Sequence, residues 1–109
     1  MNILFSQLKG IINGRDGKIV LRAMAESNVE CITVTFQDGF MVESRGVPER
    51  FPEELIFFVD DLLHYAVDGY SYGEGGSGVV RLVQRGGQWD ENESGIFSEE
   101  KATQSQTNF

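Results

Sequence analysis

The sequence is poor in the residues on which several classes of protein depend. Among its 109 residues there is one cysteine, Cys31, one histidine, His64, and two prolines. A lone cysteine excludes an intrachain disulfide and agrees with a reducing compartment. No apolar run approaches the roughly 18 residues of a membrane-spanning helix, and the N-terminus lacks the basic start and cleavage site of a secretory signal. We therefore expect a cytoplasmic protein that does not enter a membrane.

Few side chains suit catalysis. His64 has three aspartates nearby in the sequence, but no nucleophile is paired with it. Cys31 falls in a predicted strand, where a small buried hydrophobic side chain is its usual role. The Gly-rich segment 73–78 precedes a predicted strand rather than a helix and contains Glu74 but no lysine, which disfavours a phosphate loop. We predict a non-enzymatic protein without a cofactor, and keep a small enzyme centred on His64 as a third hypothesis.

Size and patterning indicate one α+β domain over residues 1–97. Helices are predicted over 2–13, where apolar residues recur at helical spacing, and over 52–67, the most apolar segment. We expect an antiparallel sheet of about five strands with two helices on one face, followed by a flexible polar tail over 98–109. The predicted strands are 18–25, 30–36, FMVESR, GVVRLVQ and a last strand that begins at Gln88.

The turn after residue 37 sets the register of the first predicted hairpin. A two-residue Asp38-Gly39 loop would place Val34 opposite Glu43. A three-residue loop, with Gly39 left-handed, would instead place Val34 opposite Val42. We favour the three-residue loop, because it keeps the apolar side chains on one face.

The net charge of −8 is unevenly distributed. Residues 1–48 carry five acidic and five basic side chains, whereas residues 49–109 carry twelve acidic and four basic ones. Such a field repels nucleic acid and anionic membranes and speeds encounter with basic surfaces. We expect the partner to be a basic protein surface or a nucleoprotein complex, with no direct contact to nucleic acid or to a membrane. The alternative is that the charge only confers solubility; the sequence leaves the oligomeric state open.

The predicted helix 52–67 has a wide apolar arc and an opposite acidic arc. Phe57 falls in the middle of the acidic arc, as an interface anchor with an acidic rim would. The alternative is that a loop or the N-terminal helix covers Phe57. Two tyrosines in the Gly-rich loop that follows suggest a contact loop. The predicted partner-binding residues are Phe57, Asp60, Asp61, His64, Asp68, Tyr70, Tyr72, Asp90, Glu91 and Glu93.

The stretch WDENESGIF, residues 89–97, supports another hypothesis. Asp90, Asn92 and Ser94 stand at the first, third and fifth positions of a calcium loop of the EF-hand kind. The twelfth position, which needs a Glu, is Lys101, and the loop offers fewer oxygens than the about six to eight that Ca²⁺ takes. We therefore expect no resident metal and assign the acids of this loop to an acidic surface, with a calcium-responsive module as an alternative.

The segments ECITVTF, GYSYGEGGSGVVRLV and WDENE, in their order around the apolar helix, resemble a family of small acidic proteins carried on plasmids, phages and other mobile elements. The resemblance covers about residues 30–93. In size and acidity the chain is also similar to anti-CRISPR inhibitors. The resemblance implies no catalytic residue and favours the blocking of a host defence complex. We therefore expect an inhibitor that masks a nucleic-acid-handling partner as a DNA mimic, with carboxylates in place of phosphates; an immunity protein that neutralises a toxin is a close alternative.

Overall fold

The computed structural model describes residues 2–98, so the predicted flexible tail lies outside the described residues apart from Ser98. These residues form an α+β fold, as predicted, with an antiparallel sheet. The elements of the described range are β1 (Asn2–Leu4), the 3₁₀ turn η1 (Phe5–Leu8), α1 (Lys9–Ile12), α2 (Arg15–Glu26), β2 (Cys31–Gln37), β3 (Phe40–Arg45), α3 (Glu54–Ala66), the 3₁₀ turn η2 (Tyr70–Tyr72), β4 (Ser77–Arg85), β5 (Gln88–Trp89) and β6 (Gly95–Ser98).

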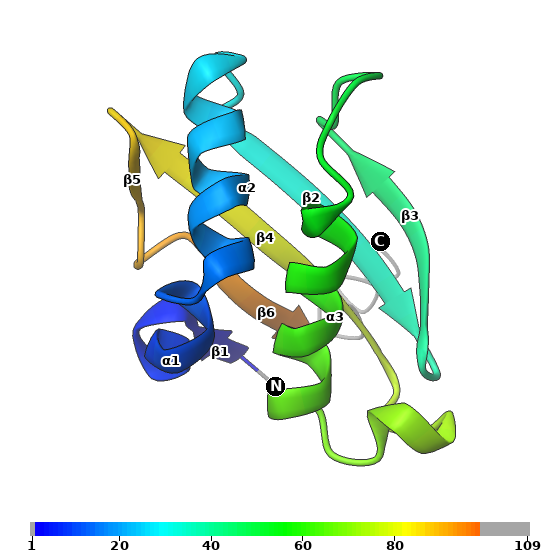
Figure 1. Cartoon of the computed structure of the whole chain (residues 1–109). Helices are drawn as coiled ribbons and strands as arrows, with labels where there is room; N and C mark the ends of the chain where they lie inside the picture. The colour runs from blue at the N-terminus through cyan, green and yellow to red at the C-terminus, as the bar shows by residue number, and fades with distance from the viewer. Residues whose placement is uncertain (1, 99–109) are drawn as a thin grey trace, which may run out of the picture.

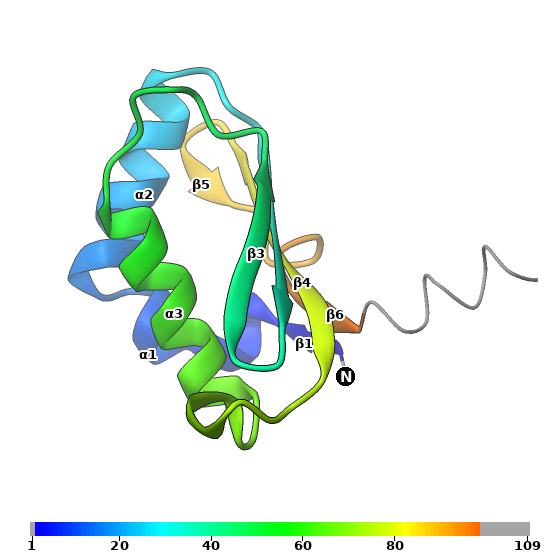
Figure 2. The ribbon, with the colours of Figure 1, turned by 90° about the vertical axis from the view of Figure 1, so that its right-hand side faces the viewer.

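The sheet has the strand order β1-β6-β4-β2-β3, and the short β5 pairs with the end of β4. β2 and β4 form its centre, while β1 and β3 are its edges. Figure 1 shows α2 and α3 side by side in front of the sheet, and Figure 2 shows both on the same side of it. Within residues 2–98, no helix covers the opposite face of the sheet, which antiparallel sheets tolerate.

The core lies between the helices and the sheet. Alternate residues of β2 are buried, as the predicted strand 30–36 requires, and the inward arc of α3 covers them. Burial of these side chains is the main driving force of folding. The largest contributions from these two elements come from Ile32, Val34, Phe36, Leu55, Phe58, Val59, Leu62 and Leu63.

Three aromatic rings fix the rotation of α3 about its axis. The Phe58 ring lies edge-on to Phe5, with ring centroids 6.1 Å apart, and stacks on Trp89 at 5.9 Å. Phe5 and Trp89 also meet directly, at 5.3 Å. Aromatic pairs of this kind add stabilisation beyond the area that they bury. The cluster therefore joins the N-terminal segment, α3 and β5, and it holds the Phe58 side of α3 against the core.

The prediction of a strand over 18–25 is wrong, because this segment belongs to α2. Its charged residues Lys18 and Arg22 are four apart, and the buried Val20 and Met24 are also four apart. That spacing is helical, and Asp16 in the first turn favours the positive end of the helix. Ile19 and Val20 are β-branched and favour a strand locally, but the helical spacing of the buried residues outweighs that preference.

The predicted helix over 2–13 is only partly correct. Residues 2–4 form β1, which pairs with β6 in the register Asn2↔Phe97 to Leu4↔Gly95. The expected apolar positions after it are nevertheless buried, at Phe5, Leu8 and Ile12. The sheet has five strands in its main order, with β5 beside β4, which agrees with the predicted sheet of about five strands, although β1 and β6 were not predicted and the segment 18–25 is not among them.

The preferred three-residue hairpin loop is also wrong. Asp38 and Gly39 both have positive φ, of 45° and 89°, which is the backbone of a two-residue type I′ turn. Beyond the turn a β-bulge shifts the register of β3, so that Val34 lies opposite Ser44 rather than Val42. Val42 thereby lies without a partner in β2.

We predict that Gly95→Ala destabilises the fold. Gly95 has a φ of 147°, and a Cβ atom there would lie 2.2 Å from the carbonyl oxygen of Ile3 in β1. The strand pair would have to separate, at a cost of about 2 kcal/mol or more in the free energy of unfolding. Chemical denaturation measures this cost.

Gly10→Ala is the matched control, because nothing lies within 4 Å of its added Cβ in α1. A Gly95→Ala protein that is as stable as Gly10→Ala would contradict the β1–β6 pairing.

Candidate functional site

On its solvent side, α3 carries large exposed apolar side chains next to acidic ones. Phe57 is 57% exposed, so neither a loop nor the N-terminal segment of the described residues covers it. Asp61 and His64 follow at helical spacing on the same face, and Asp60 and Tyr65 flank them. We call Phe57, Asp60, Asp61, His64 and Tyr65 the outer surface of α3.

The outer surface of α3 is negatively charged. The Nδ1 atom of His64 lies 2.9 Å from the carbonyl oxygen of Asp60 and 3.4 Å from the Asp60 carboxylate, so His64 is held by one turn of its own helix. No ion pair within residues 2–98 involves Asp61 or Asp68, and both are exposed. The carboxylates of Asp61 on this surface and of Asp68 just past the end of α3 are therefore free to meet a cation of a partner.

Tyr70 is unsuitable as a partner-binding residue, contrary to the prediction. Its ring is buried and makes edge-on contacts with Phe36 at 6.2 Å and with His64 at 5.0 Å. Burial and the nearby Asp60 carboxylate raise the pKa of the Tyr70 hydroxyl above its usual value. Tyr72, two residues later in η2, is 85% exposed and remains available.

The loop of residues 90–94 does not join the outer surface of α3. Figure 2 shows this loop, in orange between β5 and β6, on the side of the sheet opposite α3. Arg85 forms ion pairs with both Asp90 and Glu93, and its single positive charge offsets part of the negative charge of the loop. The Asp90 carboxylate also accepts hydrogen bonds from the N–H groups of Asn92 and Glu93, both at 3.1 Å. These acids stabilise a turn, and only the exposed Glu91 has no such role among the described contacts.

The calcium ligand set predicted around Asp90 is not assembled. Ser94 is fully buried, where its Oγ accepts a hydrogen bond from the N–H of Val83 at 2.8 Å and donates one to the Val83 carbonyl at 3.0 Å. Its hydroxyl therefore ties the loop to β4 instead of facing a cation. Within residues 2–98, no three side chains of His, Cys, Asp or Glu come together as a metal-binding group.

Cys31 is exposed rather than buried, which corrects its expected role in the core. It begins β2 with its side chain on the face opposite Ile32, and its sulfur lies 4.0 Å from the Thr33 hydroxyl. The alternation of a strand placed it outside, because Ile32 takes the buried position.

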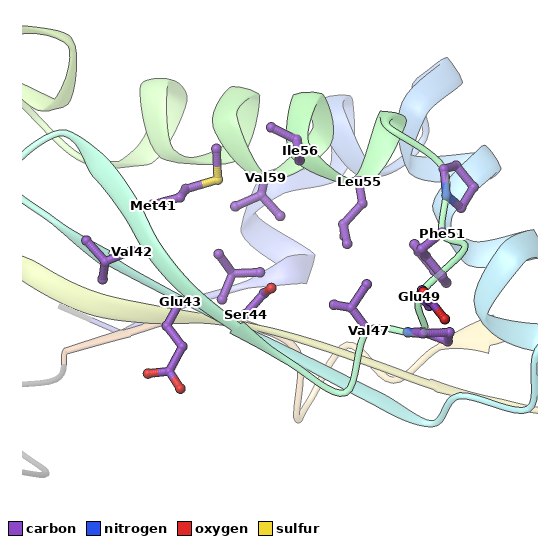
Figure 3. A pocket seen from close by; sticks show the side chains of 13 residues that line it. Met41, Val42, Glu43, Ser44, Val47, Glu49, Phe51, Leu55, Ile56 and Val59 are labelled. Atoms are coloured by element: carbon purple, nitrogen blue, oxygen red, sulfur yellow. The ribbon is translucent and has the colours of Figure 1, made fainter.

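An apolar cleft between β3 and α3 was not predicted from the sequence. It has a volume of about 520 Å³, and Figure 3 shows side chains from both elements around it. It was missed because it depends on how β3 packs relative to α3, and the predicted register of β3 was wrong. Its apolar lining comprises Val34, Met41, Val42, Val47, Pro48, Phe51, Pro52, Leu55, Ile56 and Val59.

We predict that Ser94→Ala lowers stability and that calcium has no effect on it. The substitution leaves both the N–H and the carbonyl group of Val83 without their side-chain partner, at a cost of about 1–3 kcal/mol. Ser71→Ala is the control, because Ser71 is exposed. Thermal unfolding with and without calcium measures both effects. A melting temperature that rises with calcium and no longer rises in Asp90→Ala would contradict the structural role of this loop.

No protein-family model matches the chain, and no curated protein or solved structure matches it. Within residues 2–98, none of the helices is long and apolar enough to cross a bilayer. An assignment of function therefore depends on the surfaces described above.

Proposed function

We propose that the protein is a non-enzymatic binding protein that docks the outer surface of α3 on a basic surface of a partner protein and thereby inhibits or masks it. The observation that carries this proposal is Phe57, a large apolar side chain that is more than half exposed among carboxylates on a rigid helix. Buried aromatic residues with a polar rim supply most of the affinity of protein interfaces. A helix presents such a residue with little conformational freedom to lose.

The negative charge on and next to the outer surface of α3 favours a partner with a basic surface. Asp61, one helical turn from Phe57, and Asp68, just past the end of α3, are exposed and unpaired within the described range, so an approaching lysine or arginine gains an interaction without breaking an existing ion pair. Such charges raise the association rate and exclude acidic partners. Proteins that handle nucleic acids carry basic surfaces for phosphates, and carboxylates compete for them. We therefore propose a nucleic-acid-handling protein or nucleoprotein complex as the partner, as the resemblance to mobile-element proteins also favours.

Phe57→Ala is expected to weaken binding of the partner about tenfold or more, because truncating a central aromatic residue costs above about 1 kcal/mol. The partner is first isolated from source-cell lysate with the tagged full-length chain at low salt, identified by mass spectrometry and then titrated in purified form. Phe40→Ala is the matched control, since Phe40 is 70% exposed but lies on β3. Equal affinities of the two variants would overturn the proposal.

Neutralising the exposed acids should act differently. Asp61→Asn with Asp68→Asn is expected to slow association and to reduce the salt dependence of binding, because these charges act at long range. The control with the same change of charge is Glu91→Gln with Glu93→Gln, in the loop on the other side of the sheet. Stopped-flow association rates at several salt concentrations distinguish the two double variants. An identical salt dependence in both would argue against α3 as the charged contact.

A further inference from the structure

β3 is an open edge of the sheet. It pairs with β2 on one side, and within residues 2–98 no strand and no backbone hydrogen bond joins its other side. An antiparallel strand directs alternate N–H and C=O groups away from its neighbour, so β3 presents unpaired groups outward. Such an edge is a template for a strand from another chain.

The cleft between β3 and α3 runs beside this open edge. The connection from β3 to α3 closes one end of it with Val47, Pro48 and Phe51, as Figure 3 shows for Val47 and Phe51. Val42 and Ile56 line it from its two walls and are 56% and 57% exposed. An added strand would therefore place every second side chain near apolar walls.

The β-bulge of β3 helps to form this arrangement. Met41 lies opposite Phe36, and Glu43 lies opposite Thr35, so Val42 is the extra residue. A bulge bends its strand and redirects side chains. Met41 and Val42, on either side of the point where the register shifts, are the two apolar residues that β3 contributes to the lining of the cleft.

The charges around the cleft indicate the chemistry of its occupant. The ionisable residues that line it are Glu43 and Glu49, without any lysine or arginine. Glu43 is paired with Arg45 at 3.0 Å, which leaves Glu49 near the closed end to meet a cation. A second copy of this chain would bring another net charge of −8 to the same place, which opposes self-association.

We propose that β3 and the cleft bind an extended segment of another protein, with apolar residues at alternate positions and lysine or arginine between them. The segment adds to the edge of β3 as a strand through main-chain hydrogen bonds and inserts its apolar side chains between Met41, Val42 and Ile56. Main-chain pairing supplies affinity in this mode of recognition, and the pockets supply specificity. This site uses residues other than the outer surface of α3, so it stands independently of the function proposed above.

The test uses the full-length chain labelled with ¹⁵N and short capped peptides in which valine alternates with lysine. Titration is expected to shift the backbone amide signals of Met41, Val42 and Ser44 to saturation. Two control peptides replace every lysine with glutamate, or place a proline at the centre, where it removes a main-chain donor. Both controls are expected to bind more weakly.

Ile56→Ala and Phe57→Ala form a matched pair of variants. The two residues are neighbours on α3 and equally exposed, but only Ile56 lines the cleft. Ile56→Ala should reduce the affinity for the lysine–valine peptide about fivefold, because it removes apolar contact area, while Phe57→Ala leaves that affinity unchanged. Amide spectra of the variants without peptide show whether they are folded.

Three results would overturn the proposal. In the first, the amide shifts caused by the peptide map to another surface of the protein. In the second, the glutamate peptide binds as tightly as the lysine peptide. In the third, the β3 amide signals shift with protein concentration alone, which would make a second copy of the chain the occupant. None of these results changes the expected loss of affinity of Phe57→Ala for the isolated partner. Failure at the cleft is therefore distinguishable from failure of the proposed function.

Discussion

The packing of Phe58 against both Phe5 and Trp89 is the contact on which the surfaces of this protein depend. Because successive residues of a helix point about 100° apart, fixing Phe58 inward also fixes the direction of its neighbours. Phe57 is left facing solvent, and Ile56 lies along the cleft beside β3. One buried aromatic cluster thus determines both apolar surfaces for which we propose binding.

The negative charge of the second half of the chain is used in two different ways. In the loop after β5 it is partly offset, because Arg85 pairs with Asp90 and Glu93 and backbone N–H groups donate to Asp90. On α3 the negative charge remains exposed at Asp61, and just past the end of the helix it remains exposed at Asp68. Net charge alone therefore overstates the acidic surface, and the position of one arginine decides which part of it faces a partner uncompensated.

The sequence allowed prediction of those features that local periodicity determines. The alternation of β2, the apolar arc of α3 and the exposure of Phe57 follow from spacing within one segment. Features that depend on contacts between elements were missed: β1 pairs with a strand at the other end of the described chain, and the cleft needs both β3 and α3. The burial of Tyr70 was missed for the same reason, because Phe36 and His64 cover it from other elements.

Oxidative footprinting by hydroxyl radicals, read by mass spectrometry on the free chain and on its complex with the isolated partner, tests the central claim most directly. In the free chain, Phe40 and Phe57 are both exposed and should be oxidised, whereas Phe58 is buried and should be protected. We expect the partner to protect Phe57 and to leave Phe40 reactive. A complex in which Phe57 stays as reactive as in the free chain, with new protection on residues 90–94, would contradict the assignment of α3 as the binding surface.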